Sequence, residues 1–306
     1  MQQVTVRVPG STSNLGPGFD CLGVALRLYN QITISRGRSG KADQMVRSAA
    51  EAFFARTRRK SFAFRCAITG DVPQSRGLGS SVTVRLGTIH ALNELSHRPL
   101  QRQEIFDICA GLEGHPDNAA PAVYGGFNVV RGEQRQTFSV SARLQFVLLI
   151  PNFEIATEEA RRLLPTRVDR LHAVENCRNA STITAAFASR EYEKLRGAFV
   201  DHLHQPFRKK LIPFLDNVIA AAESAGALGA FLSGSGSAIC AITLRSPEQV
   251  ARAMLGAAKT AGASTIITSA DNRGARTLPI RNPPLGPELV AEGQSAVRNR
   301  SDGSPR

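Results

Sequence analysis

Apolar residues at every second position predict strands in the first half of the chain. Residues 4–8 and 62–68 alternate apolar with polar or small side chains, which is the period of a strand with one buried face. Residues 24–34 follow this rule less strictly, and the uninterrupted apolar run 146–150 favours a fully buried strand. A glycine pair opens one more predicted strand, at 125–130.

Apolar residues three and four positions apart predict helices. The clearest case begins at Val82, continues through Leu86 and Ile89, and gives an amphipathic helix over 82–95. Further helices are expected at 46–54, 103–112, 157–164, 182–188, 192–202 and 213–225, and a capped helix from Ser246. Further strands are expected at 227–232, 238–243 and 265–268.

This mixture of elements predicts an α+β protein with two domains. The chain has 306 residues, of which 42% are hydrophobic, enough for real cores. The pattern changes near Pro151, so we place an N-terminal domain at 1–150 and a C-terminal domain at 151–278. Residues 279–306 are rich in Pro, Gly, Ser and Arg without apolar periodicity, and we expect a disordered tail there.

Charge and cysteine usage narrow the class of protein. The formal net charge of +13 is spread along the chain, and its densest block, residues 56–60, has no interleaved aromatic residues that would stack on bases. The five cysteines include no Cys-x2-Cys pair, which favours buried free thiols. No apolar run approaches the roughly 20 residues that span a bilayer, and no signal peptide is evident, so we expect a cytoplasmic protein.

The stretch Pro73–Ser81 has the composition of an anion-binding turn between a strand and a helix. The first N–H groups of a helix lack partners and lie at the positive end of its dipole. Gly77 and Gly79 would let the backbone approach a phosphate, while Ser80 and Ser81 can cap the helix or offer hydroxyls to phosphate or magnesium. A plain capped turn has the same composition, and the common Gly-x4-Gly-Lys-Ser/Thr loop is absent.

Other loops carry small or polar residues at high density. Residues 9–20 are too rich in Gly, Pro and small polar groups for regular structure, which predicts an exposed loop. Residues 113–118 read Glu-Gly-His-Pro-Asp-Asn and cannot form a helix interior. Residues 233–237 alternate Ser with Gly and allow a tight reversal beside a ligand, or a plain hairpin loop.

Together these segments make the chain resemble homoserine kinases, members of the GHMP superfamily that also holds galactokinase, mevalonate kinase and phosphomevalonate kinase. The resemblance covers roughly Val4 to Leu278. It is carried by the motifs at 8–23, 73–81 and 232–236, and narrowed to homoserine kinases by 113–126, 160–165 and 204–208. Each glycine-bearing loop alone would be a weak signal.

The resemblance implies a fold and an activity. The fold would be of the two-domain GHMP type, with a left-handed β-α-β crossover, rare against the usual right-handed rule, and a ferredoxin-like C-terminal domain. The activity would be transfer of the γ-phosphoryl of ATP, with Mg²⁺, to the side-chain hydroxyl of L-homoserine in threonine biosynthesis. Homoserine and ATP would be the partners, without nucleic acid or membrane, and a homodimer is compatible with the family.

The resemblance also assigns roles to individual residues. Those of the phosphate cradle would be Pro73, Gly77, Leu78, Gly79, Ser80 and Ser81. Ser81 and Glu113 would be the magnesium ligands, since magnesium prefers hard oxygens and keeps several waters. The substrate would meet Asn14, Asp20, Asn118, Thr157, Arg161 and Arg208, and catalytic roles would fall to Asn118, Arg161, Ser81 and Glu113. Both arginines would hold the substrate carboxylate, with Asp20 at the ammonium at the opposite end.

One departure from the family pattern follows the serine pair. Homoserine kinases usually continue with alanines and apolar residues, whereas this chain has Val-Thr-Val-Arg at 82–85. Arg85 falls at the edge of the apolar stripe, so it must snorkel or find a carboxylate. Two other functions stay open at this point: another small-molecule kinase of the superfamily, and a non-catalytic basic module that binds nucleic acid.

Overall fold

The first sheet is antiparallel and is built around two long strands. The computed structural model describes residues 2–37, 43–132 and 134–279, so the predicted tail lies outside the described residues except for its first one. The sheet contains β1 (Gln3–Ser13), β2 (Leu22–Arg36), β3 (Phe64–Gly70), β4 (Phe127–Arg131), β5 (Gln134–Phe138) and β10 (Arg276–Thr277). Its order is β10-β1-β2-β4-β5, and β3 pairs with the far end of β2.

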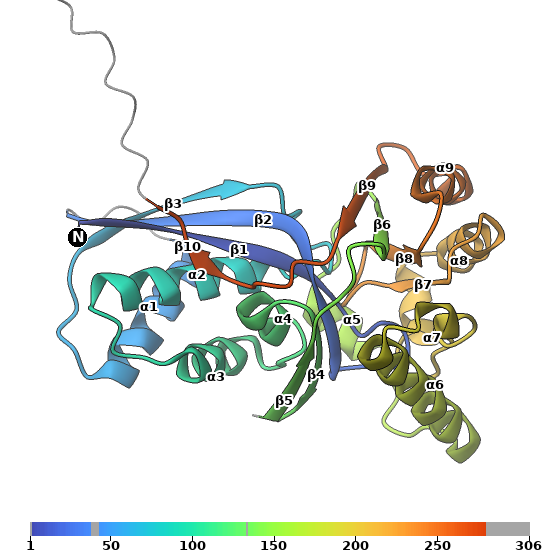
Figure 1. Cartoon of the computed structure of the whole chain (residues 1–306), viewed down its shortest axis with the longest axis horizontal. Helices are drawn as coiled ribbons and strands as arrows, with labels where there is room; N and C mark the ends of the chain where they lie inside the picture. The colour runs from blue at the N-terminus through green and yellow to red at the C-terminus, as the bar shows by residue number, and fades with distance from the viewer. Residues whose placement is uncertain (1, 38–42, 133, 280–306) are drawn as a thin grey trace, which may run out of the picture.

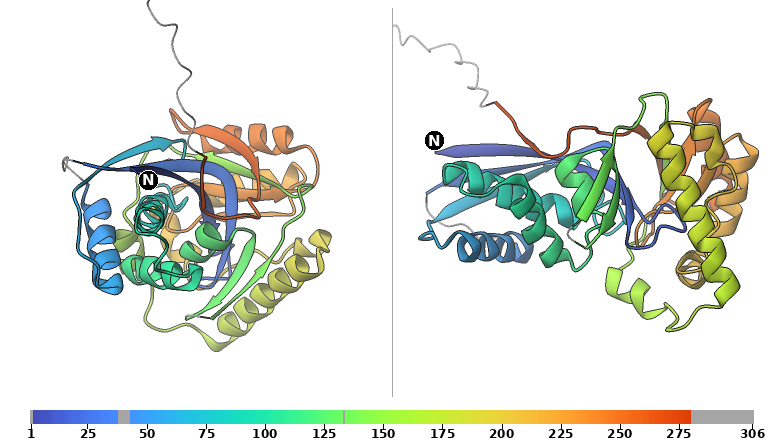
Figure 2. Two further views of the ribbon diagram at one scale, coloured as in Figure 1. Left: turned by 60° about the vertical axis from the view of Figure 1, so that its left-hand side comes forward. Right: turned by 60° about the horizontal axis from the view of Figure 1, so that its bottom comes forward.

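Helices cover one face of this sheet (Figure 1). They are α1 (Gln44–Thr57), α2 (Ser80–Leu95), α3 (Arg102–Glu113) and α4 (Ala119–Tyr124). The predicted apolar stripe of α2, from Val82 to Leu92, is buried against β1, β2 and the neighbouring helices, so α2 is the central helix of this unit. In both views of Figure 2, β1 and β2 arch over these helices.

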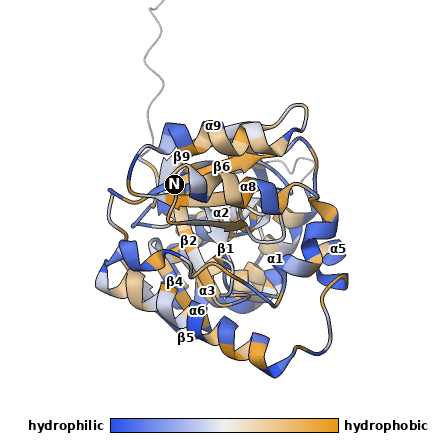
Figure 3. Ribbon diagram, turned by 90° about the vertical axis from the view of Figure 1, so that its right-hand side faces the viewer, coloured by the Kyte–Doolittle hydropathy of each residue, from blue (hydrophilic) through white to orange (hydrophobic). Residues whose placement is uncertain are grey.

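The second sheet has the ferredoxin-like arrangement that the resemblance implied. Its strands are β6 (Gln145–Ile150), β7 (Gly229–Leu232), β8 (Ile239–Thr243) and β9 (Ser264–Ser269), in the antiparallel order β7-β8-β6-β9. The helices α8 (Leu215–Ser224) and α9 (Pro247–Ala258) cross its outer face, side by side (Figure 3). Counted from β6, this is the β-α-β-β-α-β succession.

The connection from β6 to β7 supplies the remaining helices. They are α5 (Thr157–Arg162), α6 (Arg170–Ser189) and the single-turn α7 (Gln205–Arg208), with 3-10 turns at Tyr192–Leu195 and Lys209–Leu211. The helix predicted at 192–202 is wrong beyond its first turn. The reason is that Leu195, Ala198 and Phe199 are buried in the core as an irregular segment, where Phe199 stacks on Phe231.

The sheets divide the chain differently from the predicted boundary at Pro151. β6 precedes that boundary but belongs to the second sheet, and β10 follows the second sheet but pairs with β1. One hydrophobic cluster joins the two units, because Leu26 of β2, Phe127 of β4 and Phe231 of β7 pack in the same core. The second unit is therefore inserted into the first, which the apolar pattern alone did not indicate.

The expectation of an exposed loop at 9–20 is also wrong. β1 continues to Ser13 through a bulge between Pro9 and Ser11, and the chain from Val8 to Gly18 is buried. Its small residues fit there because other backbones approach closely: a Cβ on Gly16 would lie 2.5 Å from the Phe199 carbonyl oxygen. The small residues of this segment therefore allow tight packing and do not make the segment flexible.

The five cysteines are free thiols, as expected, but not all are buried. Cys109 and Cys240 are buried, Cys21 and Cys66 are half-buried, and Cys177 is exposed on α6. Among the described residues, no helix is both long and apolar enough to cross a membrane.

Candidate active site

Three glycine-bearing segments, far apart in the sequence, meet at one place. The Ser11 N–H donates to the Leu78 carbonyl over 3.1 Å, and the Ser233 hydroxyl donates to the Gly77 carbonyl over 2.7 Å. Thr12 Oγ1 and Ser233 Oγ are 2.8 Å apart. The turn before α2 is therefore clamped between the end of β1 and the loop after β7.

This clamp explains why the turn contains glycine. Gly77 and Gly79 both have φ of +69°, a conformation that favours glycine. A Cβ on Gly77 would lie 2.0 Å from the Ser233 carbonyl oxygen, and one on Gly79 would lie 2.5 Å from Ser11 Oγ. Gly79 is also the N-cap of α2, and no side chain caps the helix there. The first N–H groups of α2 thus stay available to an anion.

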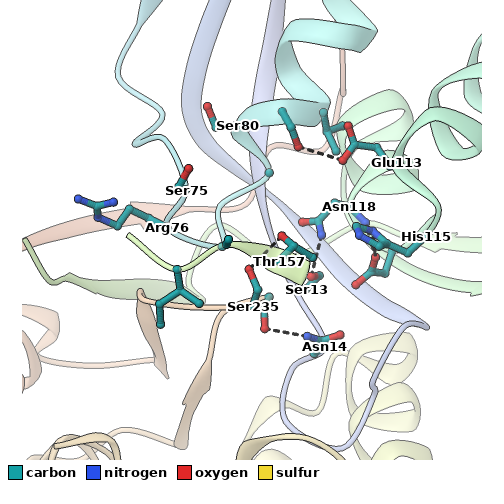
Figure 4. A pocket seen from close by; sticks show the side chains of 18 of the residues that line it. Ser13, Asn14, Ser75, Arg76, Ser80, Glu113, His115, Asn118, Thr157 and Ser235 are labelled. Atoms are coloured by element: carbon teal, nitrogen blue, oxygen red, sulfur yellow. Dashed lines mark hydrogen bonds and ion pairs between the residues drawn. The ribbon is translucent and has the colours of Figure 1, made fainter. Parts of the chain in front are cut away.

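Ser81 and Glu113 come together as predicted. The Ser81 hydroxyl donates to Glu113 Oε2 over 2.9 Å, drawn as the dashed line at Glu113 in Figure 4. The Glu113 side chain, at the end of α3, is 5% exposed. The other oxygen of this carboxylate, Oε1, is paired with the Arg85 guanidinium. Arg85 has therefore found a carboxylate.

A hydroxyl beside one carboxylate fits a magnesium ion that is bound together with a nucleotide. The described part of the chain holds no group of three or more His, Cys, Asp or Glu side chains that could enclose a metal. Magnesium keeps several waters and binds phosphate oxygens, so two protein ligands suffice when a triphosphate supplies the others. Ser81 and Glu113 are the residues that would hold it.

Asn118 lies at the centre of the site, between Glu113 and Ser13 (Figure 4). Its Oδ1 accepts from the Ser11 hydroxyl over 2.8 Å, and its Nδ2 donates to Ser13 Oγ over 2.9 Å. These contacts hold the amide in one orientation and leave one Nδ2 hydrogen for a further acceptor. Ser13 is a residue of this site that sequence reasoning missed.

The neighbouring Asp117 is buried and engaged. Its Oδ1 accepts from the Asn118 N–H over 3.1 Å and lies 3.4 Å from His115 Nδ1, an ion-pair distance without hydrogen-bond geometry. This carboxylate raises the pKa of His115. Asp117 therefore holds the loop that presents Asn118.

The expected positions of Arg161 and Asp20 are wrong in one respect. The two residues are not at opposite ends of the site: Arg161 Nη2 lies 2.7 Å from Asp20 Oδ1, and Nη1 donates to Oδ2 over 3.1 Å. Each side chain is about one third exposed, at 35%. Opposite charges on a loop and on α5 meet here, a contact that motif positions do not reveal.

Arg208, by contrast, is a buried cation without an acidic partner. It is 2% exposed and donates to the Gly234 carbonyl over 2.9 Å, yet none of the described carboxylates pairs with it. Burial, aided by the nearby Arg161 charge, lowers its pKa to about 10. A buried guanidinium costs free energy unless it is paired, so this side chain is suited to an anionic ligand.

His204 contacts the Arg208 guanidinium and holds it in place. Its Nε2 lies 2.9 Å from the Gly16 carbonyl oxygen and must donate to it, so Nδ1 is the acceptor 3.3 Å from Arg208 Nη1. Burial lowers the pKa of His204, which favours this neutral form. Phe19 stacks on His204 and packs beside the guanidinium.

One cavity collects nearly all the predicted residues. Its lining includes Asn14, Asp20, Gly77, Gly79, Ser80, Ser81, Glu113, Asn118, Thr157, Arg161 and Arg208. Pro73 and Leu78 are not in the lining. The Leu78 side chain packs into the core, while its carbonyl accepts from the Ser11 N–H and fixes the turn. Sequence reasoning missed Phe19 and Ser235; Ser235 Oγ lies 3.4 Å from Thr157 Oγ1.

Curated relatives match this chain over most of its length. Residues 44–126 match the family model of the GHMP kinases N terminal domain, and residues 184–260 match that of the GHMP kinases C terminal domain. The homoserine kinase of Caldicellulosiruptor bescii is 36% identical over 304 residues, covering 92% of this chain and 99% of that one. That of a Synechococcus species is 38% identical, covering 83% and 90%.

Solved structures show the same fold. The homoserine kinase of Cytophaga hutchinsonii superposes with a TM-score of 0.83 at 24% identity, covering 91% of this chain and 98% of that one. The mevalonate kinase of Methanococcus jannaschii reaches 0.67 at 16% identity, covering 88% and 98%. The sequence and the two-domain fold thus have the same relatives, and the chain belongs to the homoserine kinase family of the GHMP kinases.

Proposed function

We propose that this chain phosphorylates the side-chain hydroxyl of L-homoserine with ATP, a step of threonine biosynthesis, in the cytoplasm, where ATP is available. The observation that carries the substrate assignment is the buried guanidinium of Arg208, which forms no ion pair with any described carboxylate although Asp20, Asp117 and Asp201 lie near enough to act on its charge. It lines the same cavity as the α2 turn, so a carboxylate and a triphosphate can bind together. A sugar or another uncharged alcohol would leave Arg208 without a partner.

The turn before α2 supplies the nucleotide end of this site. Gly77 and Gly79 let the backbone approach the β- and γ-phosphates, and the N-terminus of α2 adds a favourable dipole. Bound magnesium neutralises phosphate charge. Ser81 and Glu113 would hold it beside these phosphates.

The acceptor end depends on Asn118 and the arginines. In the transfer, the homoserine oxygen forms a bond to the γ-phosphorus, the bond to the bridging oxygen breaks, ADP leaves with that electron pair, and the hydroxyl proton is released. Asn118 is held by Ser11 and Ser13 so that its remaining N–H can orient the acceptor oxygen. An amide cannot accept the proton, and a loose transition state requires positioning and charge neutralisation more than early deprotonation.

Asp20 and Arg161 would bind the two charges of the amino acid after exchanging partners. The two side chains neutralise each other through two hydrogen bonds. A zwitterion can replace this internal pair, since its ammonium matches Asp20 and its carboxylate matches Arg161 together with Arg208. A ligand with only one of the two charges would leave one member of the pair uncompensated.

The basic block at residues 56–60 does not favour the nucleic-acid alternative. Arg56 pairs with Glu104 at 3.2 Å, and Arg59 donates to the Ser96 carbonyl over 2.7 Å, so both side chains are engaged within the fold. We therefore propose no nucleic-acid partner.

The function is tested by an ADP-release assay across acceptors. We expect turnover with L-homoserine to exceed that with serine, threonine, mevalonate and galactose, and an amino alcohol lacking the carboxylate to react poorly. Detection of O-phosphohomoserine by phosphorus NMR identifies the product. Equal or greater turnover with mevalonate or galactose would reject the amino-acid assignment in favour of another small-molecule kinase.

We further expect that Asp117 is not the general base. Asp117→Asn keeps the shape of the buried loop and should change kcat less than about 10-fold, below the 10²–10⁴-fold typical of a lost general base. The acidic limb of the pH–rate profile should persist in this variant. A larger loss of kcat, with unfolding temperature and substrate affinity retained and that limb abolished, would make Asp117 the base.

A further inference from the structure

Arg85 forms an ion pair with Glu113, the carboxylate that would bind the metal. It follows Ser81 by four residues on α2, so the two side chains project from the same face of the helix, one turn apart. Both reach Glu113 at the end of α3: Ser81 Oγ contacts Oε2, and the Arg85 guanidinium contacts Oε1. The two oxygens of one carboxylate are thus divided between a hydroxyl and a guanidinium.

The environment makes this pair more than a surface contact. The Glu113 side chain is 5% exposed and that of Arg85 is 22% exposed, so solvent screens their charges only in part. Arg85 Nε is buried without a hydrogen-bond partner. In the described part of the chain, Glu113 is the only ionic contact of this guanidinium. A side chain held in this way places a fixed positive charge beside Ser81 and Glu113, the residues that would hold the metal.

The charge has opposite consequences for the two ligands of the site. Without a divalent ion, Glu113 would place a bare negative charge beside the phosphates of ATP, and Arg85 cancels that charge. When a divalent ion is present, the same guanidinium repels it and shares its carboxylate ligand. Electrostatics at a few ångströms therefore favours the metal-free nucleotide and disfavours the metal.

We propose that Arg85 acts as a resident cation of the nucleotide site, which supports the binding of metal-free nucleotide and weakens the binding of the divalent ion. Arg85 is then a positioning and charge-balancing residue, not a catalytic one. The proposal rests on the proposed nucleotide site and adds to it a property of this chain: the helix turn after the serine pair sets how strongly the kinase depends on metal concentration.

Calorimetry with the full chain tests this directly. Arg85→Gln and Arg85→Met remove the charge, and Arg85→Met retains much of the apolar stem. Two dissociation constants are measured for each: Mn²⁺ as the divalent probe with saturating ADP, and ATP in excess EDTA. We expect both variants to bind Mn²⁺ at least about 10-fold more tightly and metal-free ATP at least about 5-fold more weakly. Arg85→Lys, which keeps the charge, should shift either constant less than about 3-fold.

Arg98→Gln is the matched control. Arg98 lies just beyond the same helix, is 73% exposed and pairs with Glu94, so its loss changes net charge equally but far from Glu113. Both constants should stay unchanged in this variant. Changes of the same sign for metal and metal-free nucleotide, or no change, would overturn the role of Arg85 and indicate a packing role alone. Failure of the unchanged protein to bind any nucleotide would instead overturn the proposed function with it.

Discussion

Replacing Glu113 with glutamine is expected to lower kcat by about 100-fold or more, the loss typical when one stabilising contact to transition-state charge is removed. The amide keeps the size of the side chain and can still meet Ser81, so packing at the end of α3 is retained. It removes the negative charge that attracts a metal and pairs with Arg85. ATP affinity should fall much less than kcat, because the α2 turn holds the phosphates independently.

Ser81→Ala tests the second of the two residues that would hold the metal. It removes the hydroxyl that lies 2.9 Å from Glu113 Oε2 and should lower kcat to a similar degree. The double variant should lose little more than either single one, since residues acting as a unit are not additive. Glu104→Gln, the same chemical change at the exposed start of α3, is the control and should leave kcat unaffected. Near-normal kcat of both site variants at limiting magnesium would contradict this assignment.

Arg208→Lys is expected to raise KM for homoserine by about 10- to 100-fold, because hydrogen bonds to charged groups contribute about 1.5–3 kcal/mol each. Lysine keeps the charge but loses the planar fork that matches a carboxylate. It also loses the fixed geometry given by the Gly234 carbonyl and His204 Nδ1. KM for ATP should stay within about 3-fold. Steady-state kinetics with each substrate varied in turn gives both values.

Arg161→Ala should act in the same direction, and it also frees Asp20. The double variant with Arg208→Lys should lose the preference for homoserine over the matching amino alcohol without a carboxylate. Arg162→Lys, an exposed neighbour on α5, is the control and should keep both KM values. Unchanged KM for homoserine in both single variants would place the carboxylate elsewhere and reduce the substrate to a small alcohol.

The sequence predicted those parts of the site that depend on local chemistry. The strand, turn and helix around Gly77 follow from apolar spacing and from the residues that a tight turn requires. The contact between Ser81 and Glu113 was expected because each belongs to a motif with a defined role. Arg85 was expected either to snorkel or to find a carboxylate from its place on the helix, and no spacing rule indicated Glu113 as the partner.

What the sequence did not predict depends on contacts between distant segments. The segment at 9–18 looks like a loop by composition, but it is buried because Phe199 and Leu78 approach its backbone. The ion pair of Asp20 with Arg161 joins a loop to helix α5, 141 residues further along the chain. Composition and periodicity describe a residue's neighbours along the chain, so neither reports the partner that a long-range contact provides.

The return of the chain to its first sheet affects how the protein can be made. Val6 and Arg7 of β1 pair with residues 276–277, and the Leu278 N–H donates to the Thr5 carbonyl over 2.8 Å. During synthesis the second sheet therefore leaves the ribosome before the first has received its last strand. β1 must wait for β10, so its edge stays open to other chains until residues 276–277 have been synthesised.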